Sequence, residues 1–313
     1  MQSDLSRIFP IGVRYMLLSA LGFALMAACV KEVSTHGIPV MEIIAVRALV
    51  SLIISYLDVK RKGISLWGSN KPFLIARGVV GTLALICVYY AVVTLPLAEA
   101  TLIQYLHPAF TAVIALFFLK ERLHLSTLIC IVLSLVGLAI MVKPELLLGE
   151  GIELPWFGVA IAVLGALGSA IAYVLVRRLS QGEDSSVIIF YFPCIALPVS
   201  IIYPGESFVM PDGTALILLI LVGIFTQIGQ VGLTKAMQTE VAGKATAYSY
   251  VQVIFAVILG WIVFDEIPSL WTWIGGSLIV TGALINTLGS TAWQKADSWL
   301  IVRLKSFASG REK

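Results

Sequence analysis

The sequence has little charge. Only 12% of its 313 residues are Asp, Glu, Lys or Arg, whereas 59% are hydrophobic, and the mean hydropathy is +0.98. These values lie far outside the range of soluble globular domains. The low charge therefore excludes an ordinary soluble fold and predicts a membrane protein.

Histidine and cysteine are also scarce, which argues against a metal site, and we expect no cofactor. The chain has three histidines, and its cysteines occur singly in apolar segments, at Cys29, Cys87, Cys130 and Cys194. We expect these cysteines to be small packing residues. The stretch GKAT at 243–246 has Gln238 where a phosphate-binding loop needs glycine, so no ATP-driven motor is indicated.

Ten apolar segments are each long enough to cross the hydrocarbon core as a helix, which takes about 20 residues. They are too long and too uniformly apolar for barrel strands, and lipid leaves no backbone group unpaired. The sequence therefore predicts an all-α membrane protein with ten transmembrane helices, at 11–31, 38–57, 72–93, 97–119, 124–142, 155–177, 186–203, 213–235, 243–264 and 268–288.

Lysine and arginine are distributed unevenly between the predicted connections. With the N-terminus in the cytoplasm, the inner side receives nearly all of them, including the groups at 60–62 and 177–178. The outer side receives only Lys31 and Lys143. The positive-inside rule then predicts that both termini are cytoplasmic.

The chain contains one pattern twice. Residues 98–121, AEATLIQYLHPAFTAVIALFFLKE, align without a gap on residues 243–266, GKATAYSYVQVIFAVILGWIVFDE, 145 positions later. This offset holds over 64 positions with 14 identities. Each half then has five spans, and an odd number makes the second half enter from the opposite side. Inverted repeats of this kind are typical of alternating-access transporters.

Residues 77–121 carry the motifs RGVVG, YYA, LPLAEAT and LKE in that order. With the ten-span organisation, this string resembles the EamA family of the drug/metabolite transporter superfamily, and it is most similar to the G branch of the solute carrier 35 proteins and its bacterial relatives. The resemblance covers essentially the whole chain. It implies two inverted five-helix repeats and transport of an organic metabolite, such as an amino acid, S-adenosylmethionine or an organic anion, without fixing the cargo.

Arg47 is the polar residue with the greatest need of explanation, because it lies at the midpoint of its predicted span. An arginine at the centre of a bilayer costs about 2.5 to 3.5 kcal/mol on insertion scales and needs a partner. It either bonds backbone carbonyls or binds a carboxylate or phosphate of a substrate through its planar fork. Arg77 lies about one turn inside the cytoplasmic end of its span, where it either snorkels to the interface or faces a substrate.

Gln104, His107 and Thr111 form one polar stripe on the fourth predicted span. The offset pairs the first two with Ser249 and Gln252 on the ninth span. Matched polar stripes on two helices indicate either a shared central cavity or hydrogen bonds between helices in a closed bundle.

Further hydrogen-bonding and aromatic side chains are candidates for the same cavity. The full set of predicted substrate-binding residues is Arg47, Tyr89, Gln104, Tyr105, His107, Gln227, Gln230, Tyr248, Tyr250 and Gln252. Glu42 and Glu99 lie toward the outer ends of their spans, where they either act as coupling groups or simply meet water.

We divide the chain into a first repeat at 1–145, a second, inverted repeat at 146–290, and a cytoplasmic amphipathic tail at 291–313. The tail has one apolar helical stripe with basic residues off it, so we expect it either to lie on anionic lipid or to fray.

These patterns favour a secondary active or facilitative transporter for a small organic metabolite that bears a carboxylate or phosphate. The alternative is a membrane-embedded enzyme acting on a lipid-linked substrate, which usually needs clustered acids. The chain has no DDxxD-like run, so we do not expect an enzyme. The expected partners are the small-molecule substrate and the lipid bilayer, without nucleic acid, for a monomer or homodimer in a plasma membrane, as in the bacterial inner membrane.

Overall fold

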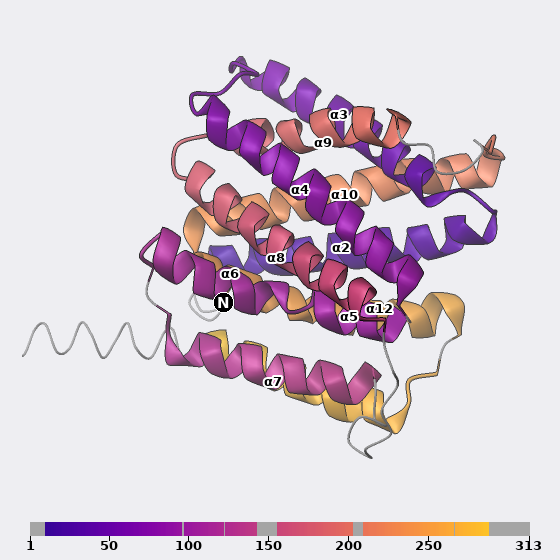
Figure 1. The fold of residues 1–313 in the computed structure, drawn as a ribbon, viewed down its shortest axis with the longest axis vertical. Helices are drawn as coiled ribbons and strands as arrows, with labels where there is room; N and C mark the ends of the chain where they lie inside the picture. The colour runs from indigo at the N-terminus through magenta and orange to yellow at the C-terminus, as the bar shows by residue number, and fades with distance from the viewer. Residues whose placement is uncertain are drawn as a thin grey trace, which may run out of the picture.

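The computed structural model describes residues 10–95, 97–121, 123–142, 155–202, 209–265 and 267–287, and over these ranges the chain is a bundle of helices without strands (Figure 1). The predicted tail at 291–313 lies outside the described residues.

The helices fall into two series in chain order. The first contains α2 (Ile11–Thr35), α3 (Val40–Lys62), α4 (Lys71–Thr94), α5 (Leu97–Gln104), α6 (His107–Phe118) and α7 (Leu125–Val142). The second contains α8 (Trp156–Leu179), α9 (Ser185–Ile202), α10 (Gly213–Thr239), α11 (Ala242–Ala247), the 3-10 turn η2 (Tyr248–Tyr250), α12 (Val251–Phe264) and, last among the described residues, a helix over 270–287.

The helix boundaries follow the offset seen in the sequence. Helices α2, α3, α5 and α7 begin 145 residues before α8, α9, α11 and the helix over 270–287, since 156 − 11 and 270 − 125 both equal 145. Among the described residues other than glycine, positive φ occurs at Lys120 (55°) and Asp265 (53°), which are also 145 positions apart. The local backbone geometry therefore repeats along with the sequence.

The two series pack against each other reciprocally. Helix α2 lies along α10, α4 lies along α8, and α3 lies along α9 (Figure 1). The contact between α7 and the helix over 270–287 is also reciprocal, because each helix presents an equivalent glycine to the backbone of the other. A Cβ added to Gly137 would lie 2.5 Å from the carbonyl oxygen of Gly275, and one added to Gly282 would lie 3.2 Å from that of Cys130. Each residue of one contact is 145 positions from its counterpart in the other.

Two of the predicted spans are interrupted. The span expected at 97–119 consists of α5 and α6 with a break at 105–106, and the span expected at 243–264 passes through η2. A break in the middle of a span frees backbone groups, which lipid tolerates only where protein or a cavity surrounds them.

Seven of the described helices are long and apolar enough to cross a membrane, and α6 and α7 are shorter apolar helices. The outer surface is apolar, since large side chains such as Phe117, Ile202 and Ile262 are at least 70% exposed. Polar side chains such as Arg47 and His107 are instead buried. This arrangement is the reverse of that in a soluble protein, and the chain is an integral membrane protein.

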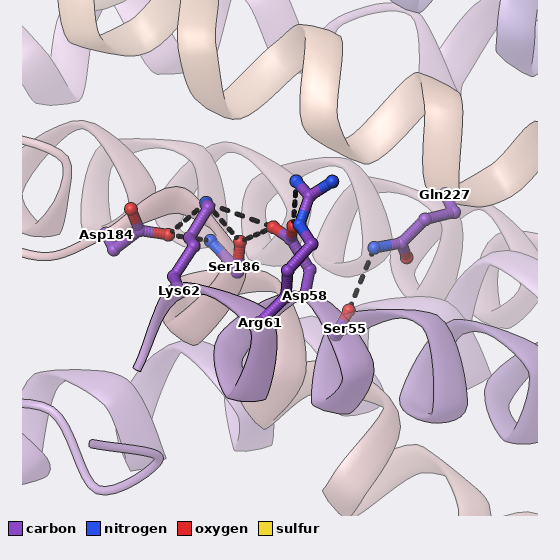
Figure 2. Close-up of polar contacts among 7 residues, drawn as sticks. All are labelled: Ser55, Asp58, Arg61, Lys62, Asp184, Ser186 and Gln227. Carbon is purple, nitrogen blue, oxygen red and sulfur yellow. Dashed lines mark hydrogen bonds and ion pairs between the residues drawn. The ribbon is translucent and has the colours of Figure 1, made fainter. Parts of the chain in front are cut away.

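A charged network ties the end of α3 to the start of α9 (Figure 2). Lys62 Nζ lies 2.9 Å from the Asp184 carboxylate and 3.0 Å from that of Asp58, and it donates to the Ser186 hydroxyl at 2.8 Å. The Ser186 hydroxyl in turn donates to Asp58. Burial opposes ionisation of Asp184, but hydrogen bonds from Lys62 and Ser186 outweigh it and lower the pKa of this carboxyl.

Glu121 makes a second link at the same end of the bundle. Its Oε1 accepts a hydrogen bond from Arg177 Nε at 2.7 Å, and its Oε2 accepts one from the backbone nitrogen of Ala242 at 2.7 Å. Arg177 Nη1 also donates to the Met237 carbonyl at 2.5 Å. Because Arg177 and Asp184 flank the short turn between α8 and α9, both links join the two series at one end.

Close packing of α2 on α10 depends on small residues. A Cβ added to Gly22 would lie 2.8 Å from the backbone nitrogen of Gly229, and the Ser19 hydroxyl donates to the Gly229 carbonyl at 2.7 Å. Small residues let helix backbones approach in this way inside membranes.

We expect Gly22→Ala to destabilise the protein by about 1 to 3 kcal/mol, because the added methyl would have to push two backbones apart. The matched control is Gly182→Ala, since a Cβ at Gly182 would meet nothing within 4 Å. Thermal unfolding in detergent measures both. Equal melting temperatures for the two variants would contradict the tight crossing.

Candidate functional site

A cavity of about 500 Å³ lies between the two series of helices. This volume is within the range of small-molecule sites. Its polar lining comes from Arg47, Arg77, Thr101, Gln104, His107, Ser169, Gln230 and Gln252. Its aromatic lining comes from Phe23, Tyr89, Tyr105, Tyr173 and Phe192. Both series contribute to both kinds of side chain.

Two arginines dominate the electrostatics of the cavity. Arg47 on α3 is 9% exposed and Arg77 on α4 is 3% exposed. Their guanidinium carbons lie 6.0 Å and 4.7 Å from the centre of the same ring, that of Phe192 on α9. Arginine is attracted to the negative face of an aromatic ring, so one apolar side chain stabilises both cations.

The hydrogen bonds of these arginines are incomplete. Arg47 Nη1 lies 3.7 Å from the sulfur of Met26, and Arg77 Nη2 lies 3.4 Å from the Gln230 side-chain oxygen. The Nε and Nη1 atoms of Arg77 are buried without a partner. No Asp or Glu is among the described residues that line the cavity. The cavity therefore has two permanent positive charges that its described lining does not neutralise.

The break between α5 and α6 orients two polar side chains toward the cavity. His107 Nδ1 lies 2.9 Å from the Gln104 carbonyl oxygen, which can only accept, so this nitrogen carries the proton. In the neutral ring the other nitrogen, Nε2, is then an acceptor, and it is buried without a partner. The Gln104 amide donates to the Ser169 hydroxyl at 3.2 Å, while its side-chain oxygen is also unpaired. Two residues of the cavity lining therefore each hold an acceptor without a partner.

The interrupted helices of the two series also meet each other at their breaks. The Tyr250 hydroxyl donates to the Tyr105 carbonyl at 2.9 Å, and the two rings stack with their centres 5.8 Å apart. This bond satisfies a carbonyl that the break leaves outside the regular helix ladder.

Most, but not all, of the predicted site residues lie together. Those that line the cavity are Arg47, Tyr89, Gln104, Tyr105, His107, Gln230 and Gln252. Three lie outside its lining and make structural bonds: Tyr250 with Tyr105, Tyr248 with Thr287 at 3.0 Å, and Gln227 with Ser55 at 2.9 Å (Figure 2).

Sequence reasoning missed several lining residues. Arg77 does not snorkel, because its side chain is buried against Phe192. Phe192 could have been found from the repeat, since it stands 145 positions after Arg47. Ser169 and Tyr173 carry no comparable signal. Glu42 accepts a hydrogen bond from the Val209 backbone at 3.1 Å and does not line the cavity. The side chain of Glu99 lies outside the described residues.

Comparison with known proteins gives consistent matches. The profile of the EamA-like transporter family matches residues 10–143 and again residues 156–288. The pseudopaline exporter CntI of Pseudomonas aeruginosa is 31% identical over 274 residues, covering 87% of this chain and 94% of the relative. Human solute carrier family 35 member G1 is 32% identical over 288 residues, covering 88% of this chain and 78% of the relative.

A solved structure supports the fold. A crystal structure aligns with a TM-score of 0.75 and 21% identity, covering 90% of this chain and 97% of the other. At this identity the match concerns the fold alone.

Two glutamines on α10 provide a direct test of the cavity. In a cysteine-free background we expect Gln230→Cys to react with a small, water-soluble thiol reagent, because position 230 lines the cavity. Gln227→Cys is the matched control and should be protected, because Gln227 is buried against Ser55. The measurement is the fraction labelled over time, and equal rates at the two positions would contradict the described lining.

Proposed function

The chain belongs to the EamA-like transporter family, and on that premise we propose that it carries a small organic metabolite across the membrane by alternating access. The cargo bears a carboxylate or a phosphate. The observation that carries this proposal is the buried cavity with two arginines and no acidic residue in its described lining.

The proposed binding set consists of the cavity residues. Arg47 binds the anionic group of the cargo, because its guanidinium fork matches a carboxylate or a phosphate. The side chains of Gln104, His107, Gln230 and Gln252 bind other polar atoms, and the aromatic rings cover the carbon skeleton, as in ligand pockets generally. The names of the relatives, an exporter and a solute carrier, support transport over catalysis.

We further propose ten transmembrane helices in two inverted five-helix repeats, with both termini in the cytoplasm. Support comes from the constant offset of the helix starts and from the reciprocal packing of α2 on α10 and α4 on α8. The double match of the family profile gives the same division. In such folds the substrate lies between the repeats, and rocking of one against the other alternates its access.

The links at Lys62 and Glu121 have a role in this mechanism. They join the two proposed repeats at one end of the bundle, and the positive-inside rule predicts that this end is cytoplasmic. An inward-open state requires these bonds to break. The contacts of Lys62 with Asp184 and of Glu121 with Arg177 thus belong to a state that is closed on the cytoplasmic side.

The role of Arg47 predicts the behaviour of two variants. Arg47→Lys should fold, because the charge survives, yet it should bind the cargo at least tenfold more weakly, because the two-pronged geometry is lost. Arg47→Gln should lose binding as well. The probe is whichever carboxylate or phosphate compound most stabilises the wild type in a thermal-shift screen, followed by its uptake into proteoliposomes.

A purely structural arginine gives the opposite pattern. Misfolding or poor expression would then be the main defect, and the protein that survives would bind with wild-type affinity. Well-folded variants with wild-type affinity would remove Arg47 from the site.

The topology predicts the accessibility of the connection after the fifth span. In a cysteine-free background, Leu147→Cys should react with a membrane-impermeant maleimide added outside intact cells. Gly182→Cys, in the turn between α8 and α9, is the matched control and should react only after the cells are opened. Labelling of position 147 from the cytoplasm alone would refute the proposed orientation.

A further inference from the structure

Arg47 and Arg77 form a pair whose charge is not balanced within the described part of the cavity. Both guanidinium groups contact the ring of Phe192, at 6.0 Å and 4.7 Å from its centre. Both residues are at least 90% buried, and neither takes part in an ion pair among the described residues. Two other cations with little exposure do have an acidic partner, since Lys244 pairs with Glu240 at 2.8 Å and Arg177 pairs with Glu121 at 2.7 Å.

An aromatic ring compensates a cation only partly. The ring supplies a quadrupole, whose attraction is much weaker than that of a full negative charge at the same distance. Two cations that share one ring also repel each other. Inside a membrane such charges mark a ligand site or an ion pathway, and here the unpaired Nε and Nη1 of Arg77 identify the missing partner as a hydrogen-bond acceptor.

We propose that the cargo carries two negative charges, one for each arginine, either as two carboxylates or as one phosphate monoester. This inference rests on the transport function proposed above and specifies its substrate class. A cargo with one negative charge would neutralise only one guanidinium and leave the other buried and unpaired. A dianion neutralises both, and the guanidinium groups become the partners of its oxygens.

The same cavity indicates what else the cargo contains. His107 Nε2 and the Gln104 side-chain oxygen are acceptors without partners, so they favour hydroxyl or amino groups on the cargo. The rings of Tyr89 and Tyr105 line the cavity and favour a carbon skeleton between the polar groups. The best fit is a small dianion with at least one hydrogen-bond donor.

The test compares compounds that share a skeleton and differ in charge. Succinate, succinamate and succinamide carry two, one and no negative charges, and malate adds a hydroxyl to the dianion. Glycerol 3-phosphate and its methyl diester make the same comparison for phosphate. Binding of each to the purified full-length protein is measured by thermal shift and by competition. We expect the dianion among the carboxylates, or the dianion among the phosphates, to bind at least tenfold more tightly than the corresponding monoanion.

The carboxylate compounds and the phosphate compounds distinguish the sources of the charge. Preference for succinate or malate assigns two carboxylates, and preference for glycerol 3-phosphate assigns a phosphate. The inference would be overturned if monoanion and dianion bound with equal affinity among both the carboxylates and the phosphates. It would also be overturned if neither the monoanions nor the dianions bound. If monoanion and dianion bind equally well, transport of the monoanion into proteoliposomes would leave the proposed function standing. Failure of every compound to be transported would count against that function too.

Variants then connect the charge preference to the two arginines. Arg47→Gln and Arg77→Gln should each remove most of the difference between succinate and succinamate, because one guanidinium remains in either variant. Arg178→Gln, at an exposed arginine near the end of α8, is the control and should keep the full difference.

Arg77→Lys covers the case in which Arg77→Gln does not fold. It retains the charge, so it should keep a preference for the dianion while binding more weakly than the wild type. A folded Arg77 variant of either kind with wild-type affinity for both probes would show that Arg77 only supports the packing of Phe192, and the inference would fail.

Discussion

Two guanidinium groups in the middle of an apolar bundle constrain the rest of this structure. The helices around Arg47 and Arg77 bury them from lipid, yet no acidic side chain among the described cavity residues neutralises them. A charge in such a place is expensive unless it has a partner. The bundle therefore needs a central space that water or an anionic ligand can occupy, and the cavity of about 500 Å³ is that space.

The broken helices follow from the same requirement. A continuous α5–α6 helix would use all its carbonyls within its own ladder, whereas the break frees polar backbone atoms at the level of the cavity. Tyr250 satisfies the Tyr105 carbonyl, and His107 satisfies that of Gln104. These two backbone carbonyls thus keep hydrogen-bond partners while the helix direction changes. These fixed bonds provide a rigid site, while the links at Lys62 and Glu121 lie farther out, where the repeats join.

The sequence was sufficient for the helical fold and for the 145-residue spacing of the helix starts, because hydrophobic length and a gapless offset are properties of the chain itself. It was insufficient for the breaks. Pro108 suggests an irregular α6, but its counterpart is Val253, so proline cannot explain the interruption in the second copy. There the irregular turn is accompanied by the bond from Tyr250 to Tyr105, which is tertiary and leaves no trace in local sequence.

The cavity lining was predictable only in part. Polar residues at mid-span, such as Arg47, Gln104 and His107, are noticed at once because lipid excludes them. Gln227 and Gln230 could not be told apart, since they lie three residues apart on one helix. Only their tertiary contacts separate them, because Gln227 donates to Ser55 whereas Gln230 contacts Arg77 and lines the cavity. The depth of Arg77 in the membrane did not decide its direction, because a side chain one turn from the interface can point either to that interface or into the bundle. The binding roles of all these residues stay predictions.

The repeat gives the site a symmetric frame with asymmetric chemistry. Arg47 and Phe192 occupy equivalent positions on α3 and α9, and they contact each other. The equivalent of Arg77 is Val222, so the first repeat supplies both cations of the cavity and the second supplies the ring. In the proposed mechanism an anion bound by the arginines therefore moves with the first repeat. Rocking changes the contacts with Phe192 and the links at Lys62 and Glu121, while the bonds from the arginines to the cargo persist. The cargo can therefore be exposed on either side without being released midway.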